Sequence, residues 1–287
     1  MSKVKIGIVQ TACSADVKAN LNKSLEYTAK AAKAGAQIIC HQEMHNTLYF
    51  CQGQDYEQFT LAEPIPGPTT EAYSKLAKEL GVVIVVPMFE KRMHGVYHNT
   101  VVVIDADGST AGIYRKMHIP QDPGFDEKFY FTPGDLGFKA IKTKFATIGT
   151  LICWDQWYPE ATRITAMKGA EIIFYPTAIG WDSKEPKEIQ AGQLDAWRTI
   201  QRGHAIANGC YVCAVNRVGT EGDLTFWGNS FLADPMGKLL FATGAENEEF
   251  VVFEADLAKI DDTRTHWPFF RDRRIDAYGD ILKRVAD

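Results

Sequence analysis

The chain has 287 residues, 46% of them hydrophobic and 23% charged, and its formal net charge is −5. These values are ordinary for a globular protein with a large core, and an acidic chain without a strong run of Lys and Arg lacks the basic face that nucleic-acid binding requires. The chain has no apolar segment of membrane-spanning length and no signal-peptide pattern, and its six scattered cysteines suggest no disulfide framework, so we expect a cytoplasmic protein.

Hydrophobic patterning in the first half of the chain predicts strands that alternate with helices, followed by a hairpin over the sequence D-A-D-G. The predicted strands are 4–10, 36–40, 82–87, 99–105 and 110–115, and the predicted helices are 21–32 and 71–80. Gly35 and Gly81 are expected to end the two helices. Residues 121–137, rich in Pro, Gly and aromatic residues, are interpreted as an ordered loop.

The second half repeats this pattern and adds a hairpin over the sequence D-P-M-G. The predicted strands are 146–152, 171–176, 211–215, 226–233, 238–242 and 250–254, and the predicted helices are 159–169 and 188–208. Alternating strands and helices combined with hairpins favour an α/β fold with layered sheets. We expect a single domain over residues 1–287. Its C-terminal tail, 257–287, has no partner strand and is expected to pack on a neighbouring subunit.

Three side chains with useful chemistry follow predicted strands: Glu43, Lys116 and Cys153. Loops at strand ends are where open α/β folds place their chemistry. A cysteine in a strand-to-helix turn can act as a nucleophile, a carboxylate can take its proton and return it to a leaving amine, and a lysine can stabilise an oxyanion together with the backbone N–H of Trp154. Each residue alone also has an ordinary structural interpretation, because sequence does not show that the three meet.

The segments around these residues resemble those of the nitrilase superfamily, the carbon–nitrogen hydrolases. Glu43 lies in I-I-C-H-Q-E-M, Lys116 in Y-R-K-M-H-I-P and Cys153 in G-T-L-I-C-W-D-Q-W-Y-P-E. Further similar stretches are F-Y-P-T-A-I-G at 174–180, A-x-x-N-x-x-Y-V at 205–212 and V-N-R-V-G at 215–219. The resemblance runs from about residue 4 to residue 256, and three linked motifs over that span are a specific signal.

The resemblance implies a four-layer α-β-β-α sandwich and a Glu-Lys-Cys hydrolase that uses no cofactor and no metal. It also implies a homodimer or a larger homo-oligomer, with helix 159–168 at the interface. The family carries a second carboxylate between the lysine and the cysteine, which here is Glu127, and in this interpretation Glu127 orients Lys116. A loop salt bridge from Glu127 to Lys128 or Arg115 is the structural alternative.

The two residues after C-W-D bear on the small-molecule ureido or amide substrate. Relatives that hydrolyse N-carbamoyl amino acids tend to have arginines there, to bind a carboxylate, whereas this chain has Gln156 and Trp157, which suit a neutral or cationic substrate. The resemblance therefore implies hydrolysis of N-carbamoylputrescine to putrescine, CO2 and ammonia, in polyamine synthesis. Asp182, or alternatively Glu185, would face the distal ammonium, although a surface charge explains Asp182 equally well. The other expected substrate contacts are Tyr49, His118, Trp154 and Gln156.

Several alternatives stay open at this point. Within the superfamily, a β-ureidopropionase or a general aliphatic amidase would fit the same motifs. In a Cys–His hydrolase, His41, His45 or His118 would activate Cys153 in place of Glu43. A zinc site at H-Q-E-M-H is disfavoured, because residues four apart on an extended chain are ~13 Å apart. A catalytically inactive relative that acts as a binding or scaffold protein is an alternative of another class, and the intact triad argues against it.

Overall fold

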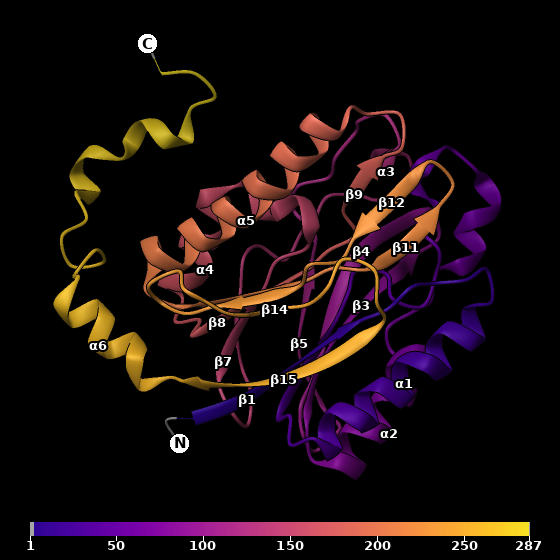
Figure 1. Cartoon of the computed structure of the whole chain (residues 1–287), viewed down its shortest axis with the longest axis horizontal. Coiled ribbons are helices and arrows are strands. Elements are labelled where there is room, and N and C mark those ends of the chain that lie inside the picture. The colour runs from indigo at the N-terminus through magenta and orange to yellow at the C-terminus, as the bar shows by residue number, and fades with distance from the viewer. Residues whose placement is uncertain (1–2, 287) are drawn as a thin grey trace.

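The computed structural model describes residues 3–286, which form two six-stranded sheets packed face to face (Figure 1). The strands of the first sheet are β1 (Lys3–Gln10), β2 (Ile38–His41), β3 (Val83–Met93), β4 (Val96–Ile104), β5 (Thr110–Arg115) and β15 (Glu249–Asp256). Those of the second sheet are β6 (Ala140–Lys142), β7 (Thr147–Thr150), β8 (Ile172–Pro176), β10 (Tyr211–Val215), β13 (Phe231–Ala233) and β14 (Leu239–Ala242). The strand orders are β15-β1-β2-β3-β4-β5 and β14-β13-β10-β8-β7-β6.

Both sheets have parallel strands at the centre and antiparallel strands towards the edges. β1, β2 and β3 are parallel neighbours in the first sheet, as are β7, β8 and β10 in the second. Strands β15, β4 and β5, and strands β6, β13 and β14, complete the sheets by antiparallel pairing. The loops that leave the carboxyl ends of parallel strands share one edge of a sheet, which is where such folds place functional groups.

Two pairs of helices cover the outer faces of the sheets (Figure 1). They are α1 (Val17–Lys33) and α2 (Pro68–Leu80) on the first sheet, and α4 (Pro159–Met167) and α5 (Lys187–Asn208) on the second. Side chains alternate along each strand: Val83 and Val85 lie in the core between the sheets, whereas Ile84 and Val86 pack beneath α1 and α2. The predicted four-layer α-β-β-α sandwich is therefore confirmed.

The helix ends follow local capping chemistry. The carboxylate of Asp16 accepts a hydrogen bond from the backbone N–H of Ala19 at 2.9 Å and begins α1. Gly81 and Gly209 end α2 and α5 in the left-handed conformation, with φ of 68° and 52°, which glycine adopts without a Cβ clash.

The prediction of one strand over 226–233 is wrong, because the chain changes sheets within that range. β12 (Leu224–Trp227) pairs with β11 (Val218–Glu221) and β9 (Gly180–Asp182) in a small third sheet, whereas β13 belongs to the second sheet. Gly228 and Asn229, with φ of 54° and 56°, turn the chain between β12 and β13. A run of apolar residues indicates extended chain, but it does not indicate which sheet accepts each part.

The loop and the tail contain short helical elements. The loop at 121–137 includes one helical turn, α3 (Glu127–Tyr130), and the tail begins with α6 (Ala258–His266). The 3-10 turns are Phe50–Gln52, Tyr56–Leu61, Cys153–Trp157, Ile275–Ala277 and Gly279–Leu282. After α6 the tail extends away from the sheets (Figure 1, yellow). Within residues 3–286 no helix combines the length and the apolar character that crossing a membrane requires.

Candidate active site

The structure brings Glu43, Lys116 and Glu127 into direct contact at one buried place. Glu43 follows β2, Lys116 follows β5 directly, and Glu127 begins α3. Lys116 Nζ lies 2.9 Å from Glu43 Oε1 and 2.6 Å from Glu127 Oε2, and all three side chains are fully buried. Cys153, which follows β7, is close enough for the charges of all three to act on its thiol.

Among residues 3–286, Lys116 and Glu43 each keep one polar group without a hydrogen-bond partner. An ammonium has three N–H donors, and Lys116 gives one to Glu43 and one to Glu127. Glu43 Oε1 accepts from Lys116 and from Asn99 Nδ2, the latter at 2.7 Å. Glu43 Oε2 is buried and has no hydrogen-bond partner among residues 3–286. A buried polar atom without a partner costs about 1–3 kcal/mol, and Oε2 is an acceptor that the described residues leave available at this place.

Glu127 is paired with Lys116 and not with the cations of its loop. Its Oε1 accepts a hydrogen bond from the hydroxyl of Tyr49 at 2.8 Å, which fixes the second carboxylate oxygen. Arg115 donates instead to Glu90, with 2.7 Å between Nε and Oε2. The alternative of a loop salt bridge to Arg115 is thus not formed.

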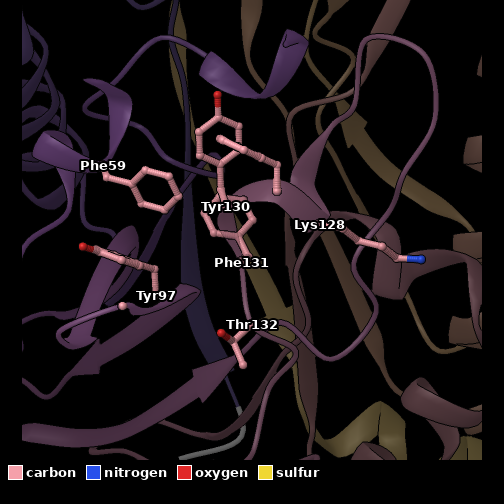
Figure 2. Close-up of a pocket in the computed structure, with 8 residues that line it drawn as sticks. Phe59, Tyr97, Lys128, Tyr130, Phe131 and Thr132 are labelled. Atoms are coloured by element: carbon pink, nitrogen blue, oxygen red, sulfur yellow. The ribbon is translucent and has the colours of Figure 1, made fainter. Parts of the chain in front are cut away.

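Aromatic packing anchors the helical turn that carries Glu127. Tyr130 of this turn packs against Phe59 with 5.4 Å between ring centroids. Figure 2 shows the rings of Phe59, Tyr97 and Tyr130 around a hollow of about 380 Å³. Lys128 lies on the same turn, and its side chain points away from these rings (Figure 2). The turn is therefore held by its apolar side chains, while Glu127 faces Lys116.

The backbone around Lys116 is fixed on both sides. Its N–H donates to the carbonyl of Asn99 at 2.9 Å, and its carbonyl accepts from the N–H of Gly134 at 2.8 Å. A Cβ at position 134 would lie 2.1 Å from the carbonyl oxygen of Arg115. Only glycine allows the loop to approach the lysine so closely.

Cys153 lies at a strained turn that Asp155 holds in place. Its φ is +43°, unusual for a residue with a side chain. Asp155 Oδ2 accepts from the N–H of Ile152 at 2.9 Å and from the hydroxyl of Tyr114 at 2.7 Å, and Asp155 Oδ1 accepts from both the N–H and Nδ1 of His118. Since Tyr114 and His118 flank Lys116 in the chain, Asp155 ties the cysteine turn to the lysine segment. The sequence analysis missed this residue, although it stands in the C-W-D motif.

Burial determines the protonation states of these groups. It raises the pKa of the Cys153 thiol well above its ordinary value, and the charge of Glu43 adds to the effect. Burial acts to lower the pKa of Lys116, but the charges of Glu127 and Glu43 outweigh it, so the pKa is raised and the lysine stays an ammonium. Burial also raises the pKa of Glu127 to about 7, against the opposing effect of Lys116. The Cys153 side chain is therefore a thiol at rest, and it can become a thiolate only if a base takes its proton.

A cavity of about 470 Å³ opens beside Cys153. Its polar and reactive lining residues are Asp122, Glu127, Cys153, Asp182, Glu185 and Gln193, and its larger apolar ones are Phe125, Trp154, Trp157, Ile179 and Trp227. Of the residues expected to contact the substrate, Trp154, Asp182 and the alternative Glu185 line this cavity.

The other expected contacts, Tyr49, His118 and Gln156, do not line this cavity. Gln156 is fully buried, and its Oε1 accepts from Trp197 Nε1 at 2.8 Å and from Thr177 Oγ1 at 3.2 Å. We therefore correct its assignment: Gln156 connects the cysteine turn to α5 and to the residue that follows β8, and it is not a substrate contact. Tyr49 lies behind Glu127 as its hydrogen-bond donor.

Comparison with known proteins agrees with this geometry. The family model of the carbon–nitrogen hydrolases matches residues 5–265. The chain belongs to the carbon–nitrogen hydrolase family. It is 46% identical to an N-carbamoylputrescine amidase of Solanum lycopersicum, over 97% of this chain and 95% of that protein, and 39% identical to a citrullinase of Francisella tularensis, over 99% and 100%. The crystal structure of a carbon–nitrogen hydrolase from Helicobacter pylori G27 covers 99% of this chain and 100% of its own, with a TM-score of 0.96 and 45% identity.

The histidines that would serve a Cys–His hydrolase make their contacts elsewhere in this carbon–nitrogen hydrolase. His41 Nε2 lies 2.8 Å from Thr28 Oγ1 of α1, and His45 Nε2 lies 2.9 Å from the hydroxyl of Tyr73 of α2. Both rings thus lie towards the helices that cover the first sheet. The ring of His118 stacks on Tyr158 with 3.7 Å between centroids. Within the described range, 3–286, no group of three or more His, Cys, Asp or Glu side chains could hold a metal ion.

Proposed function

We propose that this carbon–nitrogen hydrolase converts N-carbamoylputrescine to putrescine, CO2 and ammonia. In this proposal Cys153 is the nucleophile, Glu43 the general base and acid, and Lys116 the oxyanion donor, with Glu127 orienting the lysine. The close similarity to a plant N-carbamoylputrescine amidase over nearly the whole chain supports the substrate. The contacts of Lys116 with both carboxylates support the roles.

The charge of the cavity beside Cys153 is the observation that carries the substrate assignment. Asp122, Asp182 and Glu185 line it, and none of its lining residues is Lys, Arg or His. Carboxylates favour a cationic ligand through direct charge pairing, and Trp157 and Trp227 offer ring faces to an alkyl chain or an ammonium. A substrate with a ureido group at one end and an ammonium at the other matches this lining. A substrate carboxylate would meet no cation there.

In the first half of the proposed reaction, Cys153 attacks the ureido carbon with help from Glu43 Oε2 and the third N–H of Lys116. The Cys153 proton moves to Glu43 Oε2, and the sulfur forms a C–S bond with the ureido carbon. The third N–H of the Lys116 ammonium donates to the oxygen, which becomes an oxyanion, and the N–H of Trp154 is placed to donate as well. As the C–N bond breaks, Glu43 returns the proton to the leaving nitrogen.

Water completes the reaction. Glu43 takes a proton from water, the oxygen attacks the carbonyl carbon of the S-carbamoyl cysteine, and the C–S bond breaks. Glu43 then returns the proton to the sulfur, which regenerates the thiol of Cys153. With one amine of the urea released in each half, one water is consumed overall, and the unstable carbamic acid decomposes to CO2 and an amine. Burial of the site favours these charge movements, because few waters compete with Lys116 for the oxyanion.

We also propose that the enzyme is a homo-oligomer in which the tail packs on a neighbouring subunit. Met167 of α4 is 50% exposed and Leu282 of the tail 90%. A cavity of about 750 Å³ with further apolar residues lies between α4, α5 and the tail. Exposed apolar area of this kind indicates a protein contact. Sedimentation analysis of the intact chain and of Leu282→Asp tests this, and an unchanged monomer in both would contradict it.

A substrate panel tests the proposed reaction. Ammonia release is measured with N-carbamoylputrescine, citrulline and N-carbamoyl-β-alanine, with Cys153→Ala as the inactive control. We expect turnover of N-carbamoylputrescine alone, and a raised KM in Asp182→Asn or Glu185→Gln, whichever residue binds the ammonium. Preference for citrulline would overturn the substrate while leaving the hydrolase intact. Activity in Cys153→Ala would exclude the nucleophile.

A further inference from the structure

A fully buried arginine that follows a strand of the second sheet contacts the turn that carries Glu43. Arg217 lies between β10 and β11 and is fully buried. Its Nη2 donates to the carbonyl oxygens of Glu43 at 2.8 Å and of Met44 at 2.9 Å, and its Nη1 reaches the carbonyl of Thr47 at 3.3 Å. Arg217 does not line the cavity beside Cys153, so it is outside the reacting groups.

The turn at 43–47 depends on such a cation for its shape. It forms no strand or helix, and Met44 has a φ of +45°, a left-handed conformation that disfavours residues with a Cβ. The Met44 carbonyl also accepts from the backbone N–H of Thr47 at 3.1 Å, whereas the carbonyls of Glu43 and Thr47 accept from Arg217. A buried carbonyl that loses its donor carries the desolvation cost of an unmet acceptor. The planar guanidinium supplies several donors in fixed directions, which a point charge does not.

The same guanidinium is linked to the second carboxylate of the site. Arg217 Nη1 donates to Glu221 Oε1 at 2.8 Å, and Glu221 Oε2 accepts from the backbone N–H of Tyr49 at 2.6 Å. The hydroxyl of Tyr49 then donates to Glu127 at 2.8 Å. One buried ion pair therefore fixes the main chain of Glu43 and the side chain that orients Glu127.

We propose that Arg217, with Glu221, is a positioning residue for the hydrolytic reaction: it sets where Glu43 and Glu127 stand relative to Cys153 and Lys116. The inference rests on the proposed roles of Glu43 and Glu127. It assigns Arg217 no contact with substrate. Its removal should lower the rate of chemistry more than substrate affinity, because Asp182 and Glu185, the carboxylates proposed to bind the substrate ammonium, are not among its hydrogen-bond partners.

The test compares Arg217→Lys and Glu221→Gln with Ile172→Ala, a control for destabilisation alone. Ile172 is buried in the core between the sheets and is not part of the site. Lysine at position 217 keeps the positive charge but lacks the planar set of N–H donors of arginine. Glutamine at position 221 has one acceptor oxygen for two donors, Arg217 and the N–H of Tyr49. For each variant we measure kcat and KM with N-carbamoylputrescine, the thermal midpoint, and the pH dependence of Cys153 alkylation by iodoacetamide, which needs no substrate turnover.

We expect kcat to fall about 10²-fold in Arg217→Lys, the effect of a displacement near 1 Å, with KM little changed and the pH profile of alkylation shifted. Glu221→Gln should show the same pattern more weakly, and Ile172→Ala should lower only the thermal midpoint. The proposal is overturned if both variants keep the parent's pH profile and lose no more kcat than Ile172→Ala. A Glu43→Gln protein distinguishes failure of the positioning role of Arg217 from failure of the proposed triad. If it is inactive while Arg217→Lys is normal, the positioning role alone fails, and if it is fully active, the proposed triad fails as well.

Discussion

Replacing Lys116 by methionine separates its catalytic role from its structural one. The substitution removes the ammonium that contacts both Glu43 and Glu127, at 2.9 and 2.6 Å. Loss of an oxyanion donor typically costs about 3–4 kcal/mol in the transition state. At 1.36 kcal/mol per tenfold change, kcat should fall by roughly 10²–10³. Two buried carboxylates without their cation should also lower the free energy of unfolding by about 3–5 kcal/mol.

A second substitution distinguishes the two effects. In Lys116→Met with Glu127→Gln, one of the two buried negative charges is gone, so we expect part of the stability to return while kcat stays low. Glu127→Gln alone is the control for loss of the carboxylate. Urea unfolding gives the free energies, and ammonia release from N-carbamoylputrescine gives kcat. A folded Lys116→Met protein with kcat within about tenfold of the parent would refute the oxyanion role of Lys116.

Two further changes test the electrostatics and the packing of the site. Because the pKa of Glu127 is raised to about 7, its contribution to stability is present below the ordinary carboxyl range and is lost as pH rises through 7. We therefore expect the free energy of unfolding of the parent, measured by urea unfolding, to fall relative to that of Glu127→Gln as the pH rises from the ordinary carboxyl range to above 7. The same pH dependence of the unfolding free energy in both proteins would contradict this. In Gly134→Ala the new Cβ would lie 2.1 Å from the Arg115 carbonyl, so we expect Lys116 to be displaced and kcat to fall about 10²-fold. Gly203→Ala, where a Cβ on α5 meets nothing within 4 Å, is the matched control, and equal kcat in the two variants would show that the close approach at Gly134 is unimportant.

Gln156 illustrates where inference from sequence fails. A substrate contact was expected there because relatives that hydrolyse N-carbamoyl amino acids tend to have arginines at the two positions after C-W-D, to bind a carboxylate. The five residues from Cys153 to Trp157 form a 3-10 turn, whose side chains point in different directions. Trp154 and Trp157 line the cavity, whereas Gln156 turns inward and bonds to Trp197 of α5. The direction of the Gln156 side chain depends on a partner far along the chain, since Gln156 and Trp197 are separated by 41 positions.

Local signals in the sequence determined most elements of the fold and the residues to which chemistry can be assigned. Apolar periodicity and the glycines at 81 and 209 marked strands and helix ends, because those signals act within a few residues. The motifs around Glu43, Lys116 and Cys153 indicated the family, and the family model matches residues 5–265.

Only the tertiary structure decided how those residues are held. Arg217 bonds to the carbonyl of Glu43 across 174 positions of sequence, and Asp155 reaches Tyr114 across 41. It also split the predicted strand 226–233 between two sheets. The physical reason is common to these cases: the free energy of a buried donor, acceptor or charge is set by the partners that folding brings to it, and those partners lie too far along the chain for any local pattern to record.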